Sequence, residues 1–375
     1  MTHRPRILHV NKLYYPDIGG IETVVQSIAE QTSGRFESEV MACQPRGRGE
    51  RAIINGVPVT RAGSLGTCLS MPVSLSYPLL FRKAIRRADL IHLHHPFVLG
   101  ELSALLLNSN RKMVLTWYSA IVRQKLLSKL YRPFLERLLD RVEAIVVIYP
   151  DAQRQTEILA RRVDKCVVIP PGIEIRDYDM DATLGDEVAK IRSRYAGDLI
   201  LFAGRLVYYK GLQHLIAAMP SVRGRLLVAG DGPLRQSLLR QAAELRVSDR
   251  VTFLGRLSDQ ELKAAFHACD VFVLPSTHPS EAFGMVQLEA MACRKPVVNT
   301  RLETGVPYVS LDGVTGLTVE PANPEALADA LNKLLDDEGL RRALGERGRE
   351  RVLNEFTVQV MAERTMNLYE KVLGG

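Results

Sequence analysis

The sequence SEAFGMVQLEAMA, residues 280–292, is the stretch from which the rest of the chain can be interpreted. It leads from a loop into an apolar run that favours helix, and Gly284 lies at the transition. A glycine there lets a ligand approach the backbone, and the unpaired amides of a helix N-terminus favour an anion such as a diphosphate. Glu281 precedes the transition, and Glu289 lies inside the helix, in reach of polar groups further along such a ligand. Taken alone, the pair is more typical of two solvated glutamates on an amphipathic helix.

A loop that carries two cations follows the predicted strand Leu199–Ala203. It runs from Gly204 to the start of a predicted helix and contains Arg205 and Lys210. An arginine fork and a lysine point charge in such a loop can converge on a diphosphate, although two cations on a surface are more often only solvated. The loop lacks the G-x-x-x-x-G-K-[ST] pattern of a P-loop.

Strand and helix patterns alternate along the chain, with a break at Pro170-Pro171-Gly172. The first half begins with a strand over Arg6–Val10, a loop that ends in Gly19 and Gly20, and a helix over residues 21–31. This order begins an α/β unit, and it recurs after the break. The pattern therefore predicts two doubly wound α/β domains, in which ligands bind at the carboxyl ends of the strands. The glycine pair is either a tight turn or part of such a site.

Three segments of the first half carry further expectations. Residues 45–56 are polar and rich in arginine and glycine, so we expect an irregular connection there. A basic amphipathic helix pair broken at Pro133 is predicted over residues 124–141, and a helix over residues 150–161. The basic pair carries an apolar stripe of Leu126, Leu127, Leu130, Phe134, Leu138 and Leu139. The stripe fits either packing in the core or docking on a membrane surface.

His92 and His94 lie two positions apart in a predicted strand and therefore share one of its faces. An H-x-H pair can bind zinc, but no third ligand is evident from the sequence. We therefore expect no metal site, and histidines that line a cleft or hydrogen-bond to the backbone.

Composition and charge exclude several classes of protein. The chain has 375 residues, 46% of them hydrophobic, and no run of the roughly 18–20 apolar residues needed to cross a bilayer. The N-terminus lacks a signal-peptide pattern and the five cysteines are scattered, so we expect a cytoplasmic protein with reduced thiols. The formal charge of +7 is concentrated in the first 172 residues. Since no nucleic-acid-binding motif accompanies it, we expect peripheral contact with an anionic membrane and no nucleic acid as partner.

The glutamate stretch, the Gly204 loop and the following Lys295-Pro296-Val297-Val298 together resemble the donor-site signature of retaining GT-B glycosyltransferases of the family 4 type. This group includes bacterial polysaccharide and O-antigen mannosyl- and rhamnosyltransferases. The resemblance is strong over residues 199–320 and looser in the first half. It implies two Rossmann-like domains that face a cleft, with the C-terminal helix crossing back to the first. Residues 1–172 with 356–375 would bind the acceptor, and residues 173–355 the nucleotide-sugar donor.

Individual roles follow from the same resemblance. It implies that Glu281 contacts the sugar hydroxyls and Glu289 the ribose, while Arg205 and Lys210 clamp the diphosphate. The implied catalytic residues are Arg205, Lys210, Glu281 and Tyr118. The implied nucleotide-sugar-binding residues are Gly19, Gly20, Gly204, Arg256, Phe283, Gly284, Met285, Val286 and Glu289. No DxD motif is apparent and two cations can replace a divalent metal, so we expect a metal-independent enzyme without a cofactor, whose nucleotide-sugar is a co-substrate.

Tyr118 and Ala120 are the main departure from the family pattern, which has histidine and aspartate at these positions, ahead of Ile-Val-Arg-Gln-Lys. A tyrosine hydroxyl can still donate a hydrogen bond. With an ordinary pKa of about 10 it would not carry charge or shuttle a proton near neutral pH.

The resemblance implies transfer of a hexose to a hydroxyl of a lipid-linked glycan, at the inner face of the cytoplasmic membrane, in the synthesis of a bacterial surface polysaccharide. GDP-mannose or GDP-rhamnose is the favoured donor, and a UDP-sugar is the alternative. A catalytically weak nucleotide-sugar-binding subunit of a polysaccharide-assembly complex and a GT-B sugar-nucleotide epimerase are alternatives from other classes.

Overall fold

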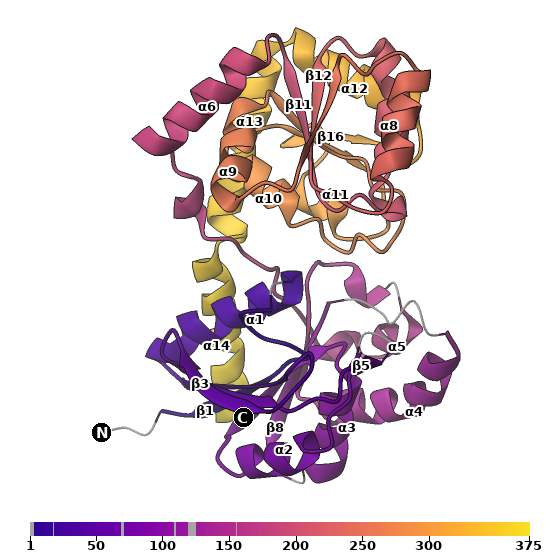
Figure 1. Ribbon diagram of the computed structural model, residues 1–375. Helices are drawn as coiled ribbons and strands as arrows, with labels where there is room; N and C mark the ends of the chain where they lie inside the picture. The colour runs from indigo at the N-terminus through magenta and orange to yellow at the C-terminus, as the bar shows by residue number, and fades with distance from the viewer. Residues whose placement is uncertain (1–3, 18, 69–70, 109, 119–124, 155) are drawn as a thin grey trace. The chain divides into compact units, whose positions relative to one another are not determined.

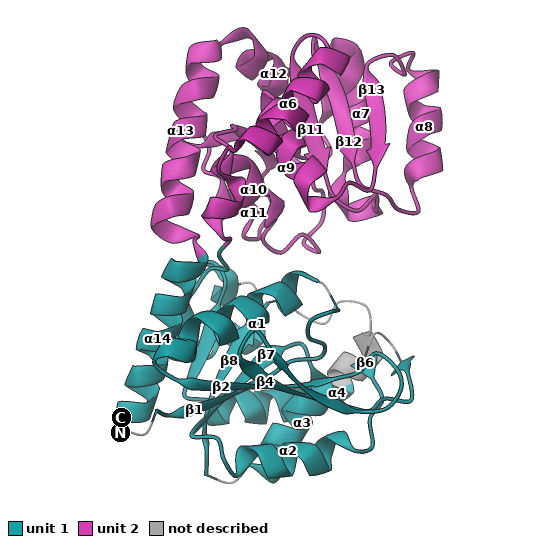
Figure 2. Cartoon of the chain, turned by 60° about the vertical axis from the view of Figure 1, so that its left-hand side comes forward, with its two compact units in different colours: residues 1–172, 358–375 teal, residues 173–357 magenta. Residues whose placement is uncertain are grey.

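The computed structural model describes residues 4–17, 19–68, 71–108, 110–118, 125–154 and 156–375. The chain divides into unit 1, residues 1–172 with 358–375, and unit 2, residues 173–357, which Figure 2 shows in different colours. The boundaries expected from the sequence lie at 172/173 and 355/356. That unit 1 binds the acceptor and unit 2 the donor stays a prediction.

The sheet of unit 1 has the strand order β10-β9-β8-β7-β1-β2-β4-β3 across the described residues. The bounds of these strands are β1 (Arg6–Val10), β2 (Glu37–Cys43), β3 (Glu50–Ile54), β4 (Val57–Ala62), β7 (Leu90–His95), β8 (Lys112–Trp117), β9 (Ala144–Val147) and β10 (Cys166–Val168). All pairings are parallel except that of β3 with β4. A short hairpin, β5 (Thr67–Cys68) and β6 (Met71–Pro72), lies outside this sheet.

Helices cover both faces of this sheet (Figures 1 and 2). They are α1 (Gly20–Gln31), α2 (Tyr77–Ile85), α3 (Val98–Leu107), α4 (Lys125–Arg141), α5 (Glu157–Ala160) and α14 (Val358–Gly374). The final helix, α14, packs against α1, and its Tyr369 contacts His9 of β1. The next residue of β1, Val10, points the other way and lies close to Gly100 of α3. This alternation is the period of a strand buried on both faces. The packing of α14 against α1 confirms that the C-terminal helix returns to the first domain.

Unit 2 has a fully parallel sheet of order β13-β12-β11-β14-β15-β16. Its strands are β11 (Leu199–Ala203), β12 (Arg225–Ala229), β13 (Val251–Gly255), β14 (Val271–Leu274), β15 (Val297–Thr300) and β16 (Gly316–Val319). Its helices are α6 (Ala182–Arg194), α7 (Leu212–Ala218), α8 (Arg235–Glu244), α9 (Asp259–Ala268), α10 (Val286–Ala292), α11 (Val306–Val309), α12 (Pro324–Asp336) and α13 (Glu338–Glu355). Every residue of β11 and β14 is buried, as expected for central parallel strands with helices on both faces.

Three expectations for unit 1 were wrong. Residues 45–56 are not an irregular connection, because β3 forms a hairpin with β4. Its turn residues Asn55 and Gly56 both have positive φ, 48° and 83°, as an Asn-Gly type I′ turn requires. The helix pair broken at Pro133 is one helix, α4, which continues through the proline. A proline removes only one helical hydrogen bond, and the buried side chains of Leu135, Leu138 and Leu139 hold the turns that follow it.

Residues 150–161 do not form one helix. The structure has a 3-10 turn over Ala152–Arg154 and the short helix α5. Ile158 and Leu159 are buried in α5, and a single apolar turn is too little to hold a longer helix in place.

None of the helices in the described part of the chain combines the length and the apolar composition that a membrane span requires.

Candidate functional site

In unit 2 the loop after β11 curls so that Lys210 returns to its beginning. Gly204 has φ +152°, and the Lys210 side chain passes 3.5 Å from where a Cβ at position 204 would lie. Lys210 itself ends the 3-10 turn Tyr208–Lys210, and Gly211 follows with φ +69°. The loop therefore depends on both glycines, because L side chains rarely adopt such conformations. It presents the Lys210 ammonium at the carboxyl end of the sheet.

The loop after β14, the neighbour of β11, supplies the partner of this ammonium. Glu281 accepts a hydrogen bond from the Ser276 hydroxyl at 3.1 Å. Its carboxylate also forms an ion pair with Lys210, whose Nζ lies 2.6 Å away. The side chains of Lys210 and Glu281 are only 12% and 11% exposed, so water screens the pair weakly. The amide of Thr277 donates to the Tyr209 carbonyl at 2.9 Å, which joins the two loops directly. Two predicted catalytic residues thus meet at one point of unit 2.

Gly284 lies just before α10, with φ +75°. A Cβ at this position would lie 2.7 Å from both Leu274 Cδ2 and Gln287 Nε2, so packing alone requires glycine here. Phe283 is buried with its ring against Phe356, whereas Met285 and Val286 are half-buried. Phe283 therefore belongs to the core, and only its backbone faces the turn before α10.

Glu289 lies on α10 and is half-buried, and none of the described residues forms a salt bridge with its carboxyl group. Burial and the neighbouring Asp259 raise the pKa of Glu289 to about 7, although Lys263 and Lys210 oppose the shift. A carboxyl group of this kind can donate a hydrogen bond when protonated and accept hydrogen bonds when ionised. It is suited to contact polar groups of a ligand such as hydroxyls, as predicted for the ribose.

Glu289 should make the stability of the protein pH-dependent. Its folded-state pKa is raised, so the protonated form favours folding below the unfolded pKa of about 4.5, and this contribution is lost as pH rises through 7. Between pH 5 and pH 8 the loss amounts to about 2 kcal/mol. Urea unfolding of the native protein and of Glu289→Gln at both pH values measures it. The free energy of unfolding of Glu289→Gln should decrease less between the two pH values than that of the native protein. An equal decrease in the two proteins would contradict the assignment.

Arg205 and Arg256 are both exposed, and within the described ranges neither has a carboxylate partner. Arg205 follows Gly204 in the lysine loop, and Arg256 follows the end of β13. Their guanidinium groups are available to an anion in solution. The structure does not bring them into contact with the pair formed by Lys210 and Glu281.

In unit 1 the predicted glycine pair forms the start of α1. Gly19 is its N-cap, in extended conformation and without a side-chain cap, and Gly20 is its first residue. A Cβ at Gly20 would meet nothing within 4 Å, so the first turn is open. The carboxylate of Glu22, in the first turn, lies against Gly19, where an added Cβ would overlap Glu22 Oε2. That Gly19 and Gly20 contact a nucleotide-sugar stays a prediction.

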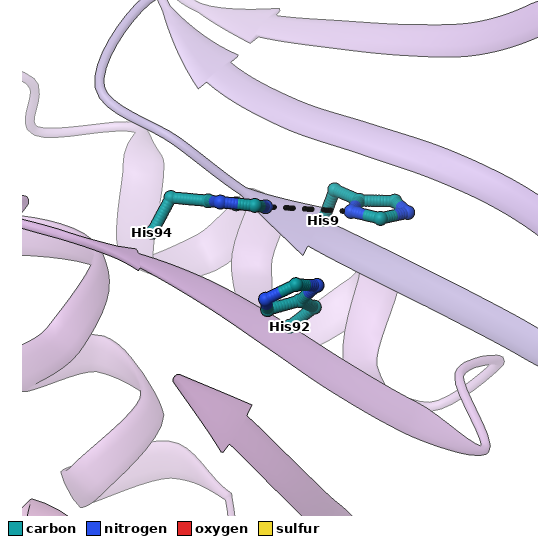
Figure 3. A group of neighbouring side chains, drawn as sticks. All are labelled: His9, His92 and His94. Atoms are coloured by element: carbon teal, nitrogen blue, oxygen red, sulfur yellow. Dashed lines mark hydrogen bonds between the residues drawn. The ribbon is translucent and has the colours of Figure 1, made fainter. Parts of the chain in front are cut away.

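Three histidines of unit 1 meet on one face of the sheet (Figure 3). His9 of β1 is paired in register with His92 of β7, and His94 lies two positions further on the same face. His92 shares hydrogen bonds with Tyr369 at 2.6 Å and Thr116 at 2.7 Å. The sequence missed His9 as the third member, because the pairing of β1 with β7 is not a local property. Of the two expectations for these histidines, lining a cleft or hydrogen-bonding to the backbone, His92 fits the first. It lines a small cavity with Thr116 and Tyr118, and its partners are hydroxyls.

Tyr118 lies directly after β8 and is 8% exposed. Its hydroxyl lies 3.1 Å from His94 Nδ1. Burial raises the pKa of Tyr118, so it stays neutral at physiological pH. Ala120, the second departure from the family pattern, and residues 121–124 lie outside the described residues.

Two family models match the chain, Glycosyltransferase Family 4 over residues 18–177 and Glycosyl transferases group 1 over residues 187–351. O-antigen chain mannosyltransferase C of Escherichia coli is 33% identical over 98% of this chain and 99% of its own length. D-rhamnosyltransferase WbpZ of Pseudomonas aeruginosa is 32% identical over 94% of this chain and 92% of its own.

Among solved structures, HepE of Anabaena, in complex with UDP and glucose, superposes with a TM-score of 0.78. The match covers 98% of this chain and 100% of HepE at 19% identity, so it speaks for the fold alone. Taken with the two relatives, which match almost from end to end, these findings show that the chain belongs to the GT-B glycosyltransferases, with a family 4 region followed by a group 1 region.

Proposed function

We propose that this glycosyltransferase moves a hexose from a GDP-sugar, with mannose or rhamnose as the favoured sugar, to a hydroxyl of a lipid-linked glycan. The sugar is suggested by two relatives that match nearly the whole chain, a mannosyltransferase and a D-rhamnosyltransferase. The first of them is an O-antigen enzyme, which suggests the synthesis of a bacterial surface polysaccharide.

The observation that carries the proposal is the ion pair between Lys210 and Glu281, formed by the loops after β11 and β14. Cleavage of the sugar–phosphate bond places negative charge on the departing diphosphate and positive charge on the anomeric carbon. A lysine held at a fixed position stabilises the first without reorganisation, and the adjacent carboxylate is placed to bind the sugar hydroxyls. Arg205, exposed and unpaired in the described structure, adds a second cation.

We propose that these two cations do the work of a divalent metal and that the sugar is transferred with retention. In this scheme the departing phosphate takes the proton of the acceptor hydroxyl. Tyr118 then needs no acid–base role, which agrees with a hydroxyl whose pKa burial raises further.

Peripheral membrane contact would place the enzyme beside a lipid-linked acceptor. On α4, Leu130 and Phe134 are 77% and 42% exposed, and Arg137 is exposed nearby. The C-terminal part of the predicted stripe, Leu138 and Leu139, is buried instead, so the helix combines a core face with an exposed apolar and basic face. Such a face suits an anionic membrane surface, with the protein on the cytoplasmic side.

Release of free nucleotide from a panel of GDP-, UDP- and dTDP-sugars, with and without EDTA, tests the proposal. We expect release from a GDP-hexose, unchanged by EDTA. The anomeric configuration of the transferred sugar, read by NMR of a product, then tests retention. Loss of turnover in EDTA would refute metal independence, and release from a UDP-sugar alone would replace the donor. Donor binding without turnover, even with an acceptor present, would favour a binding subunit.

A further inference from the structure

We propose that His94 and His9 are positioning residues, which fix the hydroxyl of Tyr118 as a hydrogen-bond donor toward a bound ligand. The inference rests on the proposed function only for the identity of the ligand atom that accepts this hydrogen bond, which is an oxygen of a sugar or of a phosphate. The proposal itself concerns where three protons lie in a chain of contacts from His9 to His94 to Tyr118.

Both imidazoles in this chain are neutral. His9 is fully buried and His94 is 1% exposed. Burial lowers the pKa of His9 to about 3, and burial together with the neighbouring rings lowers the pKa of His94. A neutral imidazole has one N–H and one bare nitrogen, so each ring can donate at only one of its two nitrogens.

His9 determines which group donates and which accepts in each of these hydrogen bonds. Its Nδ1 lies 3.4 Å from His94 Nε2, and Figure 3 shows this contact, whereas its Nε2 is buried without a partner in the described structure. An N–H without a partner is rarer in protein interiors than an under-used acceptor. The proton of His9 is therefore best placed on Nδ1, where it donates to His94. Only a bare lone pair is then left buried at Nε2.

The remaining assignments follow one from another. His94 accepts at Nε2 and must carry its proton on Nδ1. That N–H then donates to the Tyr118 oxygen at 3.1 Å. The Tyr118 hydroxyl has a single proton, which no longer points at His94. Among the described residues no other acceptor for it is within hydrogen-bond distance, and Tyr118 is 8% exposed whereas His9 has no exposure. The proton therefore has no acceptor among the described residues and is left for a ligand or water.

Tyr118 is also in the right place for a ligand contact within unit 1. It follows the carboxyl end of β8, and parallel sheets of this class bind ligands at that edge. Tyr118 also lines a small cavity together with Val24 and Ile28 of α1, which places it beside that helix. A hydroxyl that donates requires an acceptor, such as a sugar or phosphate oxygen.

A metal ion at the three histidines is the competing explanation. One potential ligand atom from each of His9, His92 and His94 lies within 4.8 Å of the others. However, both nitrogens of His92 already have hydroxyl partners, and an ion would displace one of them. No carboxylate among the described residues belongs to this cluster. The two positive charges of a divalent metal ion buried there would therefore have no negative charge beside them.

The tautomers can be measured on the ligand-free wild-type protein by long-range ¹H–¹⁵N NMR of its eight histidines. Single His9→Asn and His94→Asn variants provide the resonance assignments. We expect His9 and His94 both to carry the proton on Nδ1. A proton on Nε2 of His94 would overturn the inference, and so would a shift of the His9 and His94 nitrogens on addition of one equivalent of Zn²⁺. Neither readout depends on activity, so a failure here is separable from a failure of the proposed function.

A double-mutant cycle tests the link to the ligand. Tyr118→Phe should lower kcat/KM for the donor about tenfold, the upper range for one neutral hydrogen bond. His94→Leu should cause a similar loss, and the double variant no further loss. If the loss of kcat/KM in the double variant equals the product of the two single losses, His94 acts independently of Tyr118, and its role through Tyr118 is refuted. Affinities for GDP and for the GDP-sugar distinguish the two acceptors, because only a sugar contact spares GDP binding in Tyr118→Phe.

Discussion

Lys210→Ala is expected to lower the turnover of the donor at least about 100-fold, which is the scale for losing one fixed donor at a developing negative charge. The ammonium is held at 2.6 Å from Glu281 in a largely buried pair, and alanine removes this fixed positive charge. Steady-state nucleotide release at saturating donor measures the effect. Turnover like that of the wild type would remove Lys210 from the mechanism.

Stability and catalysis must be separated in this variant. Alanine at position 210 leaves the Glu281 carboxylate buried without its cation, and breaking a buried pair costs up to about 3–5 kcal/mol. Glu281→Gln in the same chain removes the uncompensated charge, so the double variant should regain stability but not turnover.

Arg205→Ala is the matched comparison, because Arg205 is exposed and has no ion pair in the described structure. It should also lose about 100-fold in turnover while its thermal unfolding remains unchanged. Unimpaired turnover in Arg205→Ala together with loss in Lys210→Ala would assign the diphosphate to the lysine alone.

Gly211→Ala is expected to destabilise unit 2 by about 2–5 kcal/mol, the sum of a conformational and a packing penalty. Gly211 has φ +69°, which costs a residue with a Cβ on the order of 1–2 kcal/mol. Its added Cβ would also overlap the Pro275 carbonyl oxygen and lie 2.9 Å from the carbonyl carbon, where rigid backbone cannot give way. Overpacking of this kind adds about 1–3 kcal/mol. Chemical unfolding monitored by circular dichroism measures the change.

Gly313→Ala provides the matched control. Gly313 has the same φ of +69°, but a Cβ there would meet nothing within 4 Å. The control should therefore show only the conformational penalty, about 1–2 kcal/mol. Equal destabilisation in the two variants would mean that the loops after β11 and β14 do not approach each other as closely as in the structure.

Much of the fold can be read from short segments of the sequence. The strand Leu199–Ala203 is predicted with its observed bounds, because it is an uninterrupted apolar run followed by a loop that begins with glycine. The capping box of Ser258 and Glu261 is equally local, and the structure contains both of its hydrogen bonds. The missed hairpin also had a local signal in Asn55-Gly56, which the polar composition around it concealed.

Candidate residues could be predicted one at a time, but their partners could not. Lys210 and Glu281 are each singled out by their loops, yet nothing in the sequence states that one contacts the other. Their contact follows from the adjacency of β11 and β14. His92 and His94 share a face through strand periodicity, whereas His9 joins them through the pairing of β1 with β7.

The sequence by itself determined the α/β alternation, the loops at the strand ends and the residue types that those loops present. Only the tertiary structure decided that Glu281 pairs with Lys210, that His94 stands between His9 and Tyr118, and that Glu289 is buried enough to hold its proton near neutral pH. The physical reason is one of range. Periodicity and turn chemistry act over a few neighbouring residues, whereas strand order and burial depend on how the whole chain covers its apolar surface.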